Sequence, residues 1–128
     1  MSWVTREDSR QYISCNIIPT GLALAQSWNT ALVERVGNAV GKEMETYGIT
    51  YWLAPGMNIH RNPLCGRNFE YFSEDPLLTG KMAAAMSRGV QSRRGCLATV
   101  KHFCCNNQED NRNHVSANIN ERHYVRFT

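Results

Sequence analysis

The sequence predicts an α/β fold with parallel strands, made of about two β/α units. Two apolar, strand-forming runs, at residues 49–54 and 96–100, are each preceded by a helical pattern and followed by a polar loop. This alternation is typical of a parallel sheet whose strands are connected by helices. Because a parallel strand needs neighbours on both edges and helices on both faces, we expect further β/α units to complete the sheet.

The first strong signal is a helix at residues 30–47, after an irregular lead-in at 1–26 that holds a turn at 19–21 and a short apolar run at 22–25. Asn29 is suited to cap this helix and Gly48 to end it. Gly37 and Gly41, one turn apart, should let a neighbouring backbone come close. The positions expected to face the core are Leu32, Val36, Ala39, Val40, Met44 and Tyr47.

The strand predicted at residues 49–54 is apolar on both faces, as expected of a strand covered on both sides. The polar stretch after it, residues 57–76, holds more hydrogen-bonding side chains than a spacer needs. Long polar loops between a buried strand and a helix commonly hold the chemistry of α/β proteins. Its polar members are Asn58, His60, Arg61, Asn62, Arg67 and Asn68.

A second helix is predicted from Asp75, as its cap, and Pro76, in its first turn, to about Gln91. The strand at residues 96–100 follows, and a polar loop at 104–118 comes next. Asn120 is suited to cap a last helix. The apolar side of the second helix is predicted to hold Leu78, Met82, Ala85, Met86 and Val90.

Composition excludes several classes of protein. The formal net charge is +3 and only Arg93 and Arg94 are adjacent basic residues, so nucleic-acid binding is not expected. No run approaches the roughly 18 apolar residues of a membrane span. The cysteines number five, an odd count, and form no CxxC pair, which favours reduced thiols in a cytoplasmic protein over a disulfide framework or zinc site.

The candidate site combines Arg67, from the first polar loop, with Lys101 and His102, at the end of the second strand. The loops after parallel strands share one rim, so we expect these three side chains to converge. Such a set can bind an anion or hold several sugar hydroxyls. Taken singly, Lys101 also suits a solvated position and His102 a hydrogen-bonded core position.

Other polar and aromatic residues near the site are expected to be structural. Glu109 and Asp110 lie in a dense polar run that favours an exposed loop over acid–base work. The aromatic residues Phe69, Tyr71, Phe72 and Phe103 suit loop packing. Five residues carry side chains that metals bind, but their spacing matches no standard site, so no metal is expected. They are His60, His102, Cys104, Cys105 and His114.

Residues 54–76, APGMNIHRNPLCGRNFEYFSEDP, and 98–112, ATVKHFCCNNQEDNR, strongly resemble the N-terminal catalytic domain of family-3 glycoside hydrolases, in particular bacterial β-glucosidases. SANINER at residues 116–122 continues the match. The resemblance runs from about Pro19 to Arg122. It divides the chain into a divergent lead-in at 1–18 and a fragment of this domain at 19–128.

The resemblance implies a partial (β/α)8 TIM-type barrel whose pocket binds the terminal non-reducing sugar of a β-glucoside or oligosaccharide. It implies that Arg67, Lys101 and His102 bind substrate by hydrogen bonds to hydroxyls of one sugar ring, with neither cofactor nor metal. β-Glucosides are the expected substrates, ahead of β-xylosides and N-acetylglucosaminides. Hydroxyl contacts that strengthen in the transition state also lower the barrier.

The family retains anomeric configuration through an Asp nucleophile that is followed by Trp, and through a separate acid from a later segment. None of the chain's aspartates, Asp8, Asp75 and Asp110, precedes a Trp. We therefore expect an inactive fragment without catalytic residues, whose partners are the rest of the barrel and a second domain. The alternatives are a non-catalytic sugar-binding module of the same family and a thiol or metal protein using Cys104 and Cys105.

Overall fold

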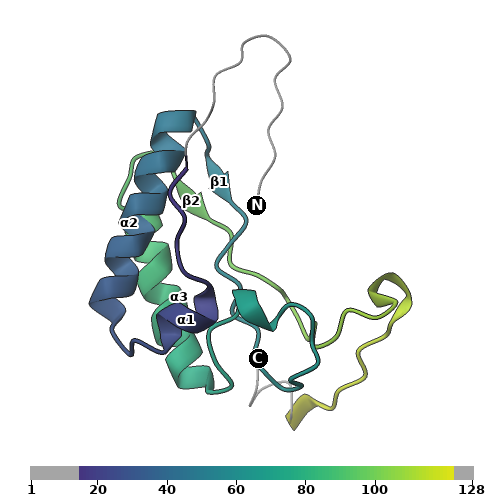
Figure 1. Cartoon of the computed structure of the whole chain (residues 1–128). Coiled ribbons are helices and arrows are strands. Elements are labelled where there is room, and N and C mark those ends of the chain that lie inside the picture. The colour runs from purple at the N-terminus through teal and green to yellow at the C-terminus, as the bar shows by residue number, and fades with distance from the viewer. Residues whose placement is uncertain (1–14, 123–128) are drawn as a thin grey trace.

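The computed structural model describes residues 15–122 and consists of two long helices packed against two short parallel strands. Helices α2 and α3 lie side by side on one side of the strands, and the segment after β2 extends away from them (Figure 1). The elements in chain order are α1 (Gly21–Ala25), α2 (Thr30–Tyr47), β1 (Tyr51–Trp52), the 3-10 turn η1 (Asn68–Glu70), α3 (Pro76–Gln91), β2 (Leu97–Ala98) and the 3-10 turn η2 (Arg112–His114).

Strands β1 and β2 are parallel neighbours, which confirms the predicted α/β class. Tyr51 pairs with Leu97, and Trp52 with Ala98. Trp52 is half-buried and packs against both apolar clusters of the core. One face of the sheet therefore rests on the helices, and the carboxyl ends of the two strands lie at the same edge.

The regular strands are shorter than the predicted runs at 49–54 and 96–100. The Ala54 N–H donates back to the carbonyl of Trp52 at 2.8 Å, and Pro55 has no N–H, so the ladder is interrupted there. Pairing resumes beyond the interruption, where Gly56 bridges to Lys101 in the parallel sense. This second contact carries the strand ends to the candidate site.

Helix α2 has the predicted bounds and caps. The Asn29 side chain accepts from the Leu32 N–H, and Gly48 has the left-handed φ of 65° that suits glycine at a helix end. Its core face differs from the prediction, because Ala39 and Tyr47 are exposed. The buried positions are Val33, Gly37, Gly41 and Met44.

The glycines explain this difference. A Cβ on Gly37 would lie 2.4 Å from the carbonyl oxygen of Met86, and one on Gly41 would lie 2.6 Å from that of Val90. Gly89 of α3 faces back, since its Cβ would lie 2.1 Å from the carbonyl oxygen of Glu34. The two helices touch through their backbones, so the glycine stripe of α2, and not its bulkiest side chains, faces α3. The predicted close approach at Gly37 and Gly41 is confirmed.

Helix α3 also has its predicted bounds. The Asp75 carboxylate accepts from the N–H groups of Leu77 and Leu78, and Pro76 occupies the first turn. The predicted apolar side is confirmed, with four members buried and Leu78 half-buried. Those four are Met82, Ala85, Met86 and Val90.

Helix α1 corrects the prediction that residues 1–26 are irregular. The Thr20 side chain accepts from the Ala23 N–H and caps one short turn, which buries Leu24 and Ala25. The helix packs against η1, because a Cβ on Gly21 would lie 2.7 Å from the carbonyl oxygen of Glu70. Thr20 before an apolar run is the signal that predicts this helix start.

Among residues 15–122 the sheet is covered by helices on one face only, so these residues do not supply the cover predicted for the other face of the first strand. Tyr51 is 64% exposed and Leu53 is 70% exposed, and Leu97, the partner of Tyr51 in β2, is 42% exposed. Side chains alternate along a strand, so these residues face away from the helices, opposite Trp52.

The last predicted helix lies mainly outside the described residues. Within residues 15–122 its first two residues, Glu121 and Arg122, are helical. Within residues 15–122 no helix has the length and apolar character needed to cross a membrane.

Candidate functional site

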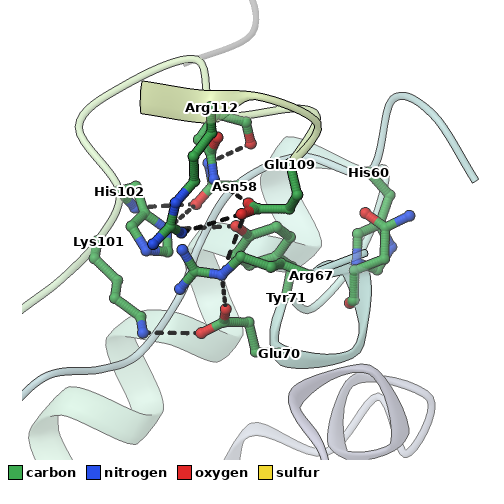
Figure 2. Close-up of polar contacts among 11 residues, drawn as sticks. Asn58, His60, Arg67, Glu70, Tyr71, Lys101, His102, Glu109 and Arg112 are labelled. Atoms are coloured by element: carbon green, nitrogen blue, oxygen red, sulfur yellow. Dashed lines mark hydrogen bonds and ion pairs between the residues drawn. The ribbon is translucent and has the colours of Figure 1, made fainter. Parts of the chain in front are cut away.

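The site begins where the two strand segments end. The Lys101 N–H donates to the carbonyl of Pro55 at 3.1 Å, and the Met57 N–H donates to the carbonyl of Lys101 at 2.7 Å. The polar loop after β1 and the segment after β2 therefore start from adjacent backbone positions. This register brings side chains that lie far apart in sequence into one cluster (Figure 2).

Glu70 joins the two cations of the cluster. The turn η1 places Arg67 and Glu70 three residues apart, and Arg67 Nε donates to Glu70 Oε1. Lys101 Nζ lies 2.9 Å from the other oxygen, Glu70 Oε2. One carboxylate thus accepts from side chains of two different loops, as Figure 2 shows. Charge-assisted contacts of this kind are stronger than neutral ones and orient both donors.

His102 is oriented by Asn58. The Asn58 side chain is only 8% exposed. Its Oδ1 lies 3.0 Å from both the backbone nitrogen and the Nδ1 of His102. Asn58 Nδ2 donates to the carbonyl of Asn106 at 3.1 Å. Asn58 therefore connects the loop after β1 to two positions beyond β2.

The buried ring of Tyr71 packs between two histidines of the site. It is 1% exposed, and its ring meets that of His102 edge-on with the centroids 5.9 Å apart. On its other side lies His60, whose Nε2 contacts the carbonyl of Asn68 at 2.8 Å. This packing holds the loop after β1 against the polar side chains of the cluster.

Glu109 closes the cluster from the loop after β2. Its Oε1 accepts from Asn106 Nδ2 at 2.7 Å and lies 3.9 Å from Arg67 Nε. Its Oε2 lies 3.0 Å from Arg112. The polar run that sequence reasoning treated as a solvated loop thus contributes one carboxylate to the site, while Asp110 is exposed as expected.

The electrostatics follow from this arrangement. Burial alone raises the pKa of Glu70, but the hydrogen bonds and charges of Arg67 and Lys101 outweigh it and hold that pKa below its usual value. Burial, together with the same two cations, lowers the pKa of His102. A hydrogen bond from Asn106 lowers the pKa of Glu109. At neutral pH the site therefore holds ionised carboxylates and a neutral imidazole.

The structure brings Arg67, Lys101 and His102 into one cluster. Of the four aromatic residues that were expected to pack in the loops, two are buried, Tyr71 and Phe72, whereas Phe69 and Phe103 are 58% and 90% exposed. Within residues 15–122 no three His, Cys, Asp or Glu side chains lie together as a metal site would need.

Two members of the cluster were missed from sequence, Glu70 as the shared acceptor and Asn58 as the partner of His102. A signal existed for Glu70, because an acidic residue three positions after Arg67 suits an ion pair within a helical turn. For Asn58 no local signal exists, since both of its partners lie beyond β2.

Comparisons with known proteins agree on one family. The family model described as "Glycosyl hydrolase family 3 N terminal domain" matches residues 8–128. The chain is 48% identical over 115 residues to the thermostable β-glucosidase B of Acetivibrio thermocellus, covering 90% of this chain and 15% of that protein. It is 44% identical over 110 residues to an exo-α-(1→6)-L-arabinopyranosidase of Bifidobacterium breve, covering 86% and 14%. The chain thus spans about a seventh of these relatives.

Solved structures give the same result. β-Glucosidase 3B of Thermotoga neapolitana, solved in complex with α-D-glucose, matches with a TM-score of 0.78 and 53% identity over 82% of this chain and 14% of that one. DesR, a β-glucosidase of Streptomyces venezuelae, matches with a TM-score of 0.80 and 38% identity over 84% and 14%. The two β/α units are therefore part of an α/β barrel, and the chain belongs to glycoside hydrolase family 3, in its N-terminal domain.

Proposed function

We propose that this chain supplies the sugar-binding rim of a retaining β-glucosidase, which hydrolyses terminal non-reducing β-D-glucosyl residues. One observation carries the proposal: Arg67, Lys101 and His102, from loops after two neighbouring parallel strands, lie in one cluster. The relatives named above as β-glucosidases, two of them solved with glucose bound, support the choice of substrate. The relative named as an arabinopyranosidase makes an L-arabinopyranoside the second candidate.

The chemistry of the cluster suits a neutral, hydroxyl-rich ligand. Arginine and lysine only donate, and sugar hydroxyls both donate and accept. Because Glu70 offsets one of the two positive charges and Glu109 also lies near Arg67, the site holds strong donors without the large positive field that would favour an anion. A site built for hydroxyls also rejects analogues that lack them, since its own polar groups are then left unpaired.

We further propose that the chain alone does not cleave glycosides. The carboxylate of Asp75 is used in capping α3, and no Asp in the sequence precedes a Trp. Glu70 and Glu109 each accept from cationic side chains and have lowered pKa values, whereas a general acid needs a raised one. The nucleophile and the acid are proposed to come from the rest of the barrel and a second domain.

The test uses the 128-residue chain itself. Saturation-transfer NMR should show D-glucose binding, and an Arg67→Ala variant should weaken it about tenfold, the equivalent of one lost hydrogen bond to a charged group. Arg88→Ala, which removes the arginine of an exposed ion pair between α3 and α2, is the matched control and should bind as the wild type does. Equal binding by both variants would overturn the assignment of Arg67. L-Arabinose in the same assay tests the second substrate.

Activity is tested separately with p-nitrophenyl β-D-glucopyranoside. No nitrophenol release is expected from the purified chain, and reproducible release would overturn the proposal that the cleaving groups lie elsewhere. The encoding DNA beyond the codon for Thr128 separates the enzyme from a non-catalytic sugar-binding module. An Asp-Trp segment in frame favours the enzyme, and a stop codon without one favours the module.

A further inference from the structure

We propose that Asn58 is a positioning residue that holds the proton of His102 on Nδ1, so that the imidazole presents a bare Nε2 and accepts a hydrogen bond from a sugar hydroxyl. The hydroxyl part of this inference rests on the proposed function, and the tautomer part does not. The structure thus assigns His102 the role of a hydrogen-bond acceptor toward the ligand, whereas Arg67 and Lys101 only donate.

Two backbone groups determine which way the Asn58 amide points. Its Oδ1 lies 3.0 Å from the backbone nitrogen of His102, which can only donate. Its Nδ2 lies 3.1 Å from the carbonyl oxygen of Asn106, which can only accept. Turning the amide over would set donor against donor and acceptor against acceptor, so the two backbone groups determine its orientation.

This orientation of Asn58 in turn constrains the imidazole of His102. The same Oδ1 lies 3.0 Å from His102 Nδ1, and an amide oxygen only accepts, so Nδ1 must carry a hydrogen. The Tyr71 hydroxyl offers the competing arrangement, in which it donates to a bare Nδ1, but its oxygen is 3.4 Å away. That arrangement would also place two lone pairs 3.0 Å apart, between Nδ1 and Asn58 Oδ1. The shorter contact therefore decides in favour of a protonated Nδ1.

The charge of the imidazole decides whether Nε2 is free to accept a hydrogen bond. A neutral imidazole has one N–H, so a proton on Nδ1 leaves Nε2 as an acceptor. Burial and the neighbouring cations Arg67 and Lys101 lower the pKa of His102, which favours the neutral ring at pH 7. Asn58 is a neutral partner, so it selects the tautomer without drawing a second proton onto the ring, as a carboxylate would.

The consequence for ligand choice is specific. A sugar ring bound between Arg67, Lys101 and His102 must offer acceptors to the two cations, and it must donate at least one O–H to Nε2 of His102. Replacing that hydroxyl by fluorine keeps an acceptor and removes the donor. We expect one monofluorinated deoxyglucose to bind about tenfold more weakly than D-glucose, the equivalent of one lost hydrogen bond.

The tautomer is read directly by long-range ¹H–¹⁵N correlation NMR on the 128-residue chain at pH 7 without sugar, with the His102 signals assigned by their loss in a His102→Gln variant. We expect a protonated, pyrrole-type shift for Nδ1 and an unprotonated, pyridine-type shift for Nε2. A protonated Nε2, a charged ring or an even mixture of tautomers would overturn the proposal. This measurement needs no variant of Asn58 to fold.

Two variants of Asn58 test whether this residue causes the tautomer preference of His102. Asn58→Ala removes the acceptor and should move the proton of His102 toward Nε2. Asn58→Asp keeps the acceptor and should keep the proton on Nδ1 while raising the pKa of the ring. An unchanged tautomer in a folded Asn58→Ala variant would show that another group holds the proton and would overturn the role of Asn58. If the Nδ1 tautomer is found but glucose does not bind, the proposed function fails and the role of Asn58 stands.

Discussion

At the scale of single residues, Glu70 organises the charges of the site. Its two oxygens accept from Arg67 and Lys101, and its side chain is only 20% exposed. Two cations that point at one place repel each other unless an anion lies between them. Glu70 therefore determines where both donors point, although it presents no donor to a sugar itself.

Replacing Glu70 by glutamine should destabilise the chain by about 1–2 kcal/mol, because two partly buried cations lose their charged acceptor. Urea unfolding followed by circular dichroism measures this. Glu34→Gln is the matched control, since it removes one carboxylate from an exposed pair with Arg88 and should cost no more than about 0.5 kcal/mol. Equal losses in the two variants would contradict the special role of Glu70.

The site should also make stability depend on pH. The pKa of His102 is lowered on folding, so the unfolded chain binds more protons as pH falls below 6.5, the ordinary value, and stability declines. The pKa of Glu70 is lowered too, so a second decline begins below 4.5 and continues through its folded value. Above pH 7 both groups contribute their full share to the stability of the fold.

Urea midpoints measured from pH 7.5 to 4 should therefore fall steadily toward acid. His102→Gln should flatten the upper part of this curve, just below pH 6.5, and leave the part below pH 4.5 sloping. A stability that rises on acidification through this range would show that His102 is not held neutral in the fold.

At the scale of elements, the contact between α2 and α3 determines the shape of the domain. It depends on three glycines, because side chains at Gly37, Gly41 or Gly89 would meet backbone atoms of the facing helix at 2.1–2.6 Å. Backbone atoms cannot move aside as side chains do, so the interface tolerates no added carbon. These helices support the strands that carry the site.

Gly89→Ala should therefore destabilise the chain by about 1–3 kcal/mol through overpacking. Gly80→Ala is the control within the same helix, since nothing lies within 4 Å of its added carbon. That control should stabilise the chain by about 0.5–1 kcal/mol, because alanine restricts the unfolded chain more than glycine does. Thermal unfolding of both variants measures the difference, and a harmless Gly89→Ala would disprove the tight contact.

At the scale of the whole molecule, the sheet presents an apolar face that the described helices do not cover. Tyr51, Leu53 and Leu97 are 64%, 70% and 42% exposed on it. Exposed apolar patches on a sheet promote association. In a larger barrel this face would lie against other strands. The chain spans only about a seventh of the length of its relatives, which agrees with this arrangement.

We expect the isolated chain to self-associate through this face at micromolar concentration. The double variant Leu53→Gln, Leu97→Thr should reduce association, as measured by sedimentation velocity. Leu77→Gln is the control, because Leu77 is 69% exposed but lies on α3, away from the sheet. Equal behaviour of the two variants would show that association uses another surface.

The sequence by itself determined the order of the elements, the bounds and caps of α2 and α3, and the family. These depend on local signals: Asn29 and Asp75 as caps, Gly48 as a stop, and two long motifs in a given order. Arg67, Lys101 and His102 could be named together because parallel strands bring their loops to one edge.

Only the tertiary structure decided which face of α2 is buried, because that face is chosen by glycines whose partners lie in α3. It also revealed Glu70 as a shared acceptor and Asn58 as the partner of His102, since these contacts join residues up to 48 positions apart. Hydrophobic periodicity predicts which positions of a single segment face the core. Periodicity does not predict which distant backbone group or cation a polar side chain contacts. The register of the two strand segments determines these contacts.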